Sequence, residues 1–365
     1  MTMNVVYIGN FKRMETGGTL RAYEVVRRIH RYGVKPYVIH LPALSKSRVA
    51  RIGALKSIEE YIVSTCSIIP KDIDLVVATS ESPSCTLAAH SIAKRIKAPW
   101  TTVMQSPIKL KYTPASMEPI LIDPLWLPQL VRTLSLLSKI RVLVVSESVI
   151  IDSSIRIPKY LVIRPSVGIE FERYTQVKCE EKVFDGVFMA RLTNEKGIFD
   201  LLKVWKRVTN VVKDVKLALI GKFKNERTRL DFLKYASKLG IIKNIMYLGY
   251  LSGISKIKIL KASKVFIYPS KLDSFPIVCL EALACGLPIT AYDISAITLN
   301  YPIETVIKVP KENIEAMAEA VLDILQNYDN WYDKAEKIGI NFAKKFTWDN
   351  VTSVEAKLYK ELISE

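Results

Sequence analysis

The sequence alternates between short apolar, β-branched runs and longer segments of helical period, and the alternation starts afresh halfway along the chain. This is the pattern of parallel α/β layers, in which a helix connects each buried strand to the next. The strand candidates of the first series are residues 4–9, 35–41, 74–80, 100–105, 141–148 and 160–166. Those of the second series are residues 185–191, 215–223, 244–251, 264–270, 287–293 and 305–311. We therefore predict two doubly wound units in tandem.

A polar stretch, PSVGIEFERYTQVKCEEK at residues 165–182, separates the two series. A chain of 365 residues is long enough for two domains at about 100–200 residues each. We expect the boundary between the domains to lie within this stretch.

Several classes of protein are not indicated. The five cysteines are scattered and form no C-x-x-C pair, so neither a disulfide framework nor a zinc site is expected. No signal peptide is evident at the N-terminus. The most apolar long window, residues 125–145, is interrupted by Pro128, Arg132, Lys139 and Arg141 and makes a poor membrane span. A cytoplasmic protein with reduced thiols is the simplest interpretation.

The charge is strongly positive and uneven. The formal net charge is +17, and residues 1–165 hold 23 lysines and arginines against 11 acids. This surplus favours an anionic partner, although a charged surface that only keeps the protein soluble is an alternative. A basic helix with Arg21, Arg27, Arg28 and Arg31, together with residues 46–51 and 109–111, would suit anionic lipid head groups. No nucleic acid partner is expected, because no recognisable binding module accompanies the charge.

Gly17 and Gly18 follow the first predicted strand and precede a helix. The unpaired N–H groups and the positive end of such a helix bind anions above the sheet. Paired glycines also mark ordinary turns, so the pair alone leaves both interpretations open.

A second stretch, ARLTNEKG, places Arg191 at the end of the first strand of the second series and Lys196 directly before Gly197. A rigid arginine fork beside a mobile lysine suits the two phosphates of a diphosphate. Both residue types are also common on solvated surfaces, which is the alternative for this pair.

A third stretch, DSFPIVCLEALACGLP, carries Asp273 and Glu281 in an otherwise apolar run. Buried helices avoid carboxylates, because an unpaired buried charge is costly. The run is therefore either a half-exposed helix with surface acids or a wall of a site whose acids accept hydrogen bonds from sugar hydroxyls.

In this order the three stretches resemble the retaining nucleotide-sugar glycosyltransferases of the GT-B fold, glycosyltransferase family 4 or group 1. RPSVGIEFERY and the terminal KFTWDNVTSVEAKLYKEL are similar to the interdomain segment and the last helix of that family. The likeness is strong over residues 185–290 and weak over 40–140. It implies two Rossmann-like domains facing a cleft: an acceptor domain of residues 1–168, onto which helix 347–365 packs back, and a nucleotide-sugar domain of residues 169–346.

The resemblance also implies roles for single residues. Arg191 and Lys196 hold the donor diphosphate and stabilise its departure, Asp273 faces the transferred sugar, and Glu281 binds the ribose. The other implied donor contacts are Gly17 and Gly18 at the phosphate, Tyr250 and Leu251 near the base, and Ser274, Phe275, Ile277 and Val278 at the sugar.

The activity implied by the resemblance is hexosyl transfer with retained configuration, without a metal or a permanently bound cofactor. The donor is a UDP- or GDP-sugar, and the acceptor is a glycan or a lipid-linked saccharide. A cytoplasmic location is expected from the reduced thiols, and the positive charge of residues 1–165 favours peripheral contact at the inner face of the membrane. We interpret the only Asp-x-Asp, Asp72 and Asp74, as a strand-entry turn, because it precedes an apolar run.

Some residues depart from the family pattern. Asp273 stands where glutamate is usual, Pro276 where glycine is common, and Gln105 near the usual acceptor-side histidine. His40 and His90 are expected to be a sheet-end and a helix residue. Three alternatives remain open at this point: a nucleotide-sugar epimerase of similar build, a basic nucleic-acid-binding protein, and a non-catalytic binding subunit.

Overall fold

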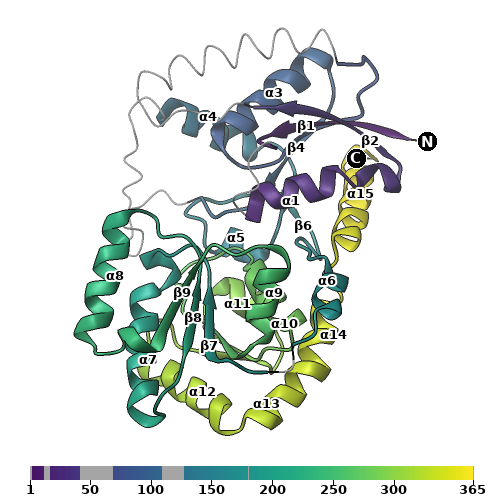
Figure 1. Cartoon of the computed structure of the whole chain (residues 1–365). Coiled ribbons are helices and arrows are strands. Elements are labelled where there is room, and N and C mark those ends of the chain that lie inside the picture. The colour runs from purple at the N-terminus through teal and green to yellow at the C-terminus, as the bar shows by residue number, and fades with distance from the viewer. Residues whose placement is uncertain (1, 12–16, 42–68, 109–126, 180, 365) are drawn as a thin grey trace. The chain divides into compact units, whose positions relative to one another are not determined.

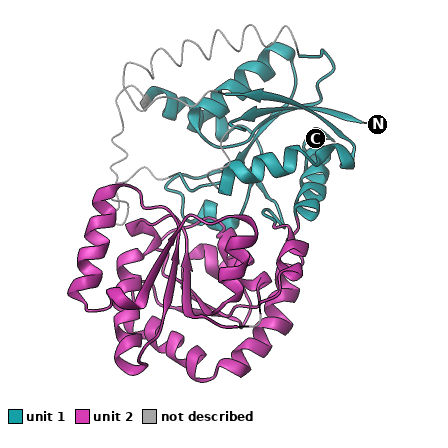
Figure 2. Ribbon diagram, viewed as in Figure 1, with its two compact units in different colours: residues 1–111, 119–168, 348–365 teal, residues 112–118, 169–347 magenta. Residues whose placement is uncertain are grey.

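The computed structural model describes residues 2–11, 17–41, 69–108, 127–179 and 181–364, which form two compact units (Figure 1, Figure 2). Unit 1 takes its described residues from 2–108, 127–168 and 348–364, and unit 2 consists of residues 169–347. The chain passes from unit 1 to unit 2 after Gly168, within the polar stretch that separates the two strand series.

Unit 1 contains a six-stranded parallel sheet in the order β2-β1-β3-β4-β5-β6. Its strands are β1 (Met3–Gly9), β2 (Val34–His40), β3 (Leu75–Ala78), β4 (Trp100–Met104), β5 (Val142–Val144) and β6 (Tyr160–Val162). The described helical segments of this unit are α1 (Gly17–Val26), η1 (Ile29–Tyr32), α3 (Pro83–Ile96), α4 (Leu127–Leu137), α5 (Glu147–Ile151) and α15 (Trp348–Ser364).

Strand β1 is buried on both of its faces. Val5 and Tyr7 belong to one apolar cluster, which includes Tyr359 of α15. Val6 and Ile8 belong to a second cluster, which includes Ile92 of α3. Alternate residues of a strand point to opposite faces, so a continuous apolar run is what a sheet covered by helices on both sides requires.

Arg21 of α1 lies in the interior of unit 1. It is 3% exposed, its guanidinium pairs with the carboxylate of Glu355 on α15, and its Nε donates to the carbonyl oxygen of Ser166 at 2.7 Å. This arginine joins the last helix of the chain to the first.

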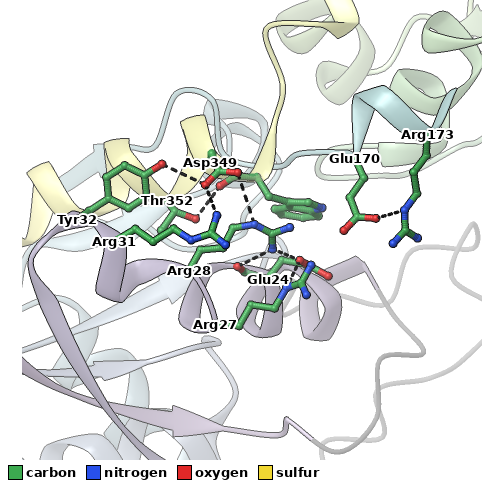
Figure 3. A network of polar contacts seen from close by, with 10 residues as sticks. Glu24, Arg27, Arg28, Arg31, Tyr32, Glu170, Arg173, Asp349 and Thr352 are labelled. Carbon is green, nitrogen blue, oxygen red and sulfur yellow. Dashed lines mark hydrogen bonds and ion pairs between the residues drawn. The ribbon is translucent and has the colours of Figure 1, made fainter. Parts of the chain in front are cut away.

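The other arginines of this basic segment are paired with acids of the same unit (Figure 3). Arg28 is 8% exposed and contacts Glu24, to which Arg27 also donates at 2.7 Å. Arg31 lies 3.0 Å from Asp349 of α15. The prediction that these arginines face a lipid surface is wrong for Arg21 and Arg28, which are buried. Arg27 and Arg31 are exposed, and each pairs with an acid of the same unit. The other two basic stretches, 46–51 and 109–111, lie outside the described residues.

Helix α4 is the helical part of the most apolar window, whose later residues form β5. Leu137 is buried, whereas Val131 is 56% exposed and Arg132 is exposed as well. None of the described helices has the length and apolarity needed to cross a bilayer.

Unit 2 repeats the architecture with a sheet of order β12-β11-β10-β7-β8-β9, again parallel throughout. Its strands are β7 (Phe184–Met189), β8 (Leu217–Ile220), β9 (Ile245–Gly249), β10 (Ser263–Tyr268), β11 (Ile289–Tyr292) and β12 (Val306–Val309). The described helical segments are α6 (Phe171–Gln176), η2 (Asn194–Lys196), α7 (Ile198–Val211), α8 (Glu226–Lys238), η3 (Ile242–Asn244), α9 (Gly253–Lys261), α10 (Ile277–Ala284), α11 (Ser295–Asn300), α12 (Ile314–Gln326), α13 (Tyr328–Lys334), η4 (Ala335–Gly339) and α14 (Ile340–Ala343).

The core of unit 2 forms where α7, α8 and α12 pack on the sheet. Trp205 of α7 is fully buried in this cluster, together with Phe232 of α8 and Val321 of α12. All twelve predicted strands are present, and the prediction of two Rossmann-like doubly wound units is confirmed. Eleven of the twelve observed strands end before the predicted runs do, because residues such as Arg191 lie in the loops that follow; β1 ends at Gly9 as predicted.

Candidate active site

The loop between β7 and α7 is held against the end of β10. The hydroxyl oxygen of Thr193 accepts a hydrogen bond from the Lys196 backbone at 3.3 Å, which closes the short turn η2. Gly197 follows with φ of 78°, and a Cβ there would lie 1.9 Å from the carbonyl oxygen of Pro269. Only glycine permits both this backbone conformation and this approach. The contact sets Lys196 beside the loop that follows β10.

Lys196 and Asp273 form the centre of the candidate site. The lysine Nζ lies 2.5 Å from Asp273 Oδ2 and donates to the carbonyl oxygen of Leu272 at 3.2 Å. The hydroxyl of Tyr268, at the end of β10, donates to the same carboxylate oxygen at 2.5 Å. The other oxygen, Oδ1, accepts from the backbone N–H of Ser274 at 2.8 Å. The carboxylate of Asp273 thus joins the end of β10, the turn η2 and the loop after β10.

The surroundings of Asp273 keep it ionised. Burial by itself would raise the pKa of this carboxyl, but the charge of Lys196 and the hydrogen bonds from Lys196, Tyr268 and Ser274 together lower the pKa below its ordinary value. Burial and the neighbouring carboxylate raise the pKa of Tyr268, so the phenol stays protonated and acts as a hydrogen-bond donor.

Glu281 lies on α10 and forms a second lysine–carboxylate pair. Its Oε1 accepts hydrogen bonds from Lys256 Nζ at 2.6 Å and from the Tyr174 hydroxyl at 2.9 Å. Its Oε2 has no hydrogen-bond partner among the described residues. The side chain is 13% exposed, so this oxygen remains able to accept a hydrogen bond from a ligand.

Helix α10 begins directly after the Asp273 loop. Pro276 stands at its N-cap, and the carbonyl oxygen of Pro276 accepts from the Tyr301 hydroxyl at 2.7 Å. The first N–H groups of a helix have no partner inside it, so Ile277 and Val278 provide backbone donors at the start of α10. The ring of Phe275 packs against Tyr301 with centroids 5.6 Å apart, which leaves its backbone as the polar part of this residue.

Arg191 follows β7 and is exposed. No hydrogen bond or ion pair joins its guanidinium to another residue in the part of the chain that the structure describes. After β9, Tyr250 is 64% exposed, and Lys222 Nζ lies 5.1 Å from the centre of its ring. Leu251 next to it is half-buried. These side chains are available for contact with a ligand.

Gly17 and Gly18 belong to unit 1, where they begin α1. A Cβ on Gly18 would lie 2.2 Å from Gln105 Oε1, so the glycine allows this side chain to pack against the start of the helix. The predicted contact of this helix start with a diphosphate stays a prediction.

The Asp-x-Asp pair and the two histidines singled out in unit 1 have structural roles. Asp72 and Asp74 precede β3 and accept hydrogen bonds from Asn4, as the strand-entry interpretation predicts. His40 ends β2, and His90 lies on α3 against Trp100. Burial and nearby cations lower the pKa of His90. Among the described residues, no group of three or more His, Cys, Asp or Glu side chains is placed to hold a metal ion.

Sequence reasoning missed three side chains of the site. Tyr268, Lys256 and Tyr174 each hold one of the two acids, but they come from β10, α9 and α6. Tyr268 lies five positions before Asp273, and its place at the end of an apolar strand was the one available signal. Lys256 and Tyr174 are too far from Glu281 in sequence for spacing to have indicated them.

Known proteins resemble this chain in sequence over unit 2. Residues 173–345 match the model of the family described as Glycosyl transferases group 1. An uncharacterized glycosyltransferase of Methanocaldococcus jannaschii is 27% identical over 197 residues, or 53% of this chain and 48% of that protein. The phosphatidyl-myo-inositol mannosyltransferase of Mycobacterium leprae is 26% identical over 167 residues, or 45% of this chain and 43% of that protein. The chain thus aligns with about half or less of the length of these relatives.

Solved structures share the architecture over nearly the whole chain. A glycosyltransferase from Rickettsia africae has a TM-score of 0.76 at 16% identity and covers 100% of this chain and 99% of its own. An Anabaena protein in complex with UDP-glucose has a TM-score of 0.73 at 13% identity over 99% of each chain. The family model matches residues 173–345 of unit 2, and the two parallel six-stranded sheets give the chain the GT-B fold of these solved glycosyltransferases.

Proposed function

We propose that the protein transfers a hexosyl unit from a nucleotide diphosphate sugar to a glycan or lipid-linked acceptor, with retained anomeric configuration. The observation that carries this proposal is the arrangement of Lys196, Asp273 and Glu281, in which a held ammonium and two ionisable acids lie on adjoining segments of unit 2. The family match covers all three residues.

Lys196 and Arg191 are the proposed ligands of the diphosphate. When the bond between the anomeric carbon and the phosphate oxygen breaks, that oxygen gains negative charge and the sugar becomes oxocarbenium-like. A fixed ammonium stabilises the developing charge without having to reorganise, because Asp273 and the Leu272 carbonyl already hold it in place. The unpaired guanidinium of Arg191 supplies a second, bidentate donor. With two cations in these roles, we propose that the transfer does not require a metal.

Asp273 has two proposed roles. It orients Lys196 through Oδ2, and a carboxylate oxygen carries two lone pairs, so Oδ1 can accept one sugar hydroxyl in addition to the N–H of Ser274. Backbone donors of Phe275, Ile277 and Val278 are the proposed partners of the remaining hydroxyls. The shorter aspartate suits this arrangement, since it reaches Lys196 and Tyr268 together.

Glu281 is the proposed ribose ligand. Lys256 and Tyr174 fix its Oε1, and Oε2 is left to accept a ribose hydroxyl. The exposed ring of Tyr250, with Lys222 beside it, is the proposed contact of the base, which is uracil or guanine. Peripheral contact with a membrane remains part of the proposal for a lipid-linked acceptor; it rests on the positive charge of residues 1–165 and not on Arg21 and Arg28, which are buried.

Thermal unfolding with a panel of UDP- and GDP-sugars tests the proposal directly. A ligand that binds only the native state raises the free energy of unfolding, by about 2.7 kcal/mol at a concentration one hundred times Kd, and therefore raises the melting temperature. We expect one donor to stabilise the full chain and the matched free hexose to have no effect. Turnover of that donor in the presence of EDTA then tests metal independence. If no nucleotide sugar stabilises the folded protein, the proposal is wrong.

A further inference from the structure

A second hollow lies in unit 2, formed by residues that have no part in the donor site proposed above. Its volume is about 280 Å³, and its walls come from the segment after α6, the end of α9, the residue after α10, and the segments α13 to α14. The lining includes Lys178, Lys182, Lys261, Cys179 and Cys285.

The hollow is positively charged. Three lysines line it against a single acid, Glu336, whose carboxylate already accepts a hydrogen bond from the Tyr332 hydroxyl at 2.6 Å. No carboxylate of a described residue forms an ion pair with Lys178, Lys182 or Lys261. Unneutralised ammonium groups around a concave surface attract an anion.

Lys182 is the most informative of the three. Its Nζ donates to the carbonyl oxygens of Lys261 at 2.7 Å and Ser263 at 3.1 Å and lies 5.3 Å from the centre of the Tyr332 ring. Burial, with Lys261 nearby, lowers the pKa of this ammonium, because both its desolvation and its like-charged neighbour disfavour the charge. An anion in the hollow would stabilise the charged form.

We propose that this hollow binds the phosphate group of a small phosphorylated molecule. Its volume is just below the usual range for ligand pockets, about 300–1,000 Å³, which suits a sugar monophosphate and is too small for a complete nucleotide sugar. Two helices connect the hollow with Glu281. Thr175 lines it from α6, whose Tyr174 donates to Glu281, and Cys285 lines it directly after α10, the helix that carries Glu281.

Cys179 allows binding here to be distinguished from phosphate binding at the donor site. It is exposed and lines the hollow, whereas burial raises the pKa of Cys285 to about 12 and leaves that thiol unreactive at neutral pH. The full chain is alkylated with N-ethylmaleimide in the presence of a hexose 6-phosphate, inorganic phosphate or the free hexose. Peptide mass spectrometry then reports the modification of Cys179 alone.

We expect hexose 6-phosphate to slow alkylation of Cys179 in a saturable way and the free hexose to have no effect. Protection by inorganic phosphate to the same extent would assign the recognition to the phosphate alone. Lys182→Met should raise the concentration needed for half-protection about tenfold, because it removes a charge-assisted contact. Lys261→Met is a second variant in case Lys182→Met perturbs folding.

The control variants are Lys238→Met, an exposed lysine on α8, and Lys196→Met in the donor site. Both should leave the protection of Cys179 unchanged. The proposal is overturned if no phosphate compound protects Cys179 in a protein that melts cooperatively, or if Lys196→Met removes the protection and Lys182→Met and Lys261→Met do not. Neither result depends on the identity of the sugar donor, so this test stands apart from that of the transferase activity.

Discussion

Two lysine–carboxylate pairs flank the start of α10, and they differ in how completely the acid is occupied. At Lys196–Asp273, both carboxylate oxygens accept hydrogen bonds from the protein, one of them from two donors. At Lys256–Glu281, two donors share Oε1 and Oε2 has no described partner. The first pair therefore holds the ammonium group of Lys196 in place, whereas the second holds the carboxylate of Glu281 in place with Oε2 able to accept a hydrogen bond. In the proposed function, the first pair contacts the diphosphate and the second contacts the ribose of one nucleotide sugar.

The largest expected effect is that of removing the positioned cation. In the proposed mechanism Lys196→Met deletes a charge that stabilises the departing diphosphate, so kcat/KM should fall by a factor of about 10²–10³. Steady-state transfer from the donor found in the melting panel measures this effect.

Lys271→Met is the matched control for this variant. Lys271 lies in the loop that carries Asp273 and its side chain is as enclosed as that of Lys196, but it pairs with Asp200 at 3.0 Å and Glu312 at 2.7 Å instead of with Asp273. This variant should lose stability while it keeps its turnover. Equal losses of turnover in the two variants would mean that Lys196 contributes only to folding.

An intermediate effect, on donor affinity, is expected from changing Glu281, whose Oε2 has no described hydrogen-bond partner. Glu281→Gln keeps the shape of the side chain but removes its charge, and a hydrogen bond to a charged group contributes about 1.5–3 kcal/mol. We expect donor Kd to rise at least about tenfold with little change in kcat. Calorimetric titration measures the affinity.

Donors that lack the 2′- or 3′-hydroxyl of ribose sharpen this prediction. If Glu281 binds the ribose, one of these deoxy donors should bind wild type and Glu281→Gln with nearly equal affinity. Lys256→Met should weaken binding less than Glu281→Gln, because Tyr174 still holds Oε1. A full tenfold loss with every deoxy donor would place Glu281 away from the ribose.

The smallest effect, on stability, is expected from removing the Tyr268 hydroxyl, which donates to Asp273. The lowered pKa of Asp273 stabilises the fold above its unfolded pKa of about 3.9, and this contribution is lost as the pH falls through the folded pKa. Tyr268→Phe removes one of the interactions that lower this pKa, so the folded value rises towards the unfolded one. The variant should be less stable by about 1 kcal/mol at neutral pH, and the difference should shrink on acidification.

Urea unfolding between pH 3 and pH 7 measures both quantities. A stability difference that stays constant over this range would assign the tyrosine to packing alone.

The fold was predictable because strand and helix periods are local properties of the sequence. Runs such as KVFIYPS are apolar throughout, and only a sheet covered on both faces buries every residue of such a strand. The ends were less predictable: Arg191 closes an apolar run in the sequence but lies beyond β7 in the structure, where it leaves the sheet.

Only those features of the site that depend on residues close together in the sequence could be predicted. Lys196 and Asp273 were each expected near a strand end, but their direct pairing depends on Gly197 fitting against Pro269, which spacing does not indicate. The arginines of the basic segment at residues 21–31 show the converse. Glu24 lies four residues before Arg28 and was a local signal of neutralisation, whereas the partner of Arg21 lies 334 positions away.

The placement of α15 has a consequence for how the protein is made. Synthesis proceeds from the N-terminus, so all of unit 2 leaves the ribosome before residues 348–364 do. Until then the guanidinium of Arg21 lacks its carboxylate at position 355, and a buried charge without its counterion is strongly unfavourable. Unit 1 can therefore complete this buried ion pair only after unit 2 has been translated.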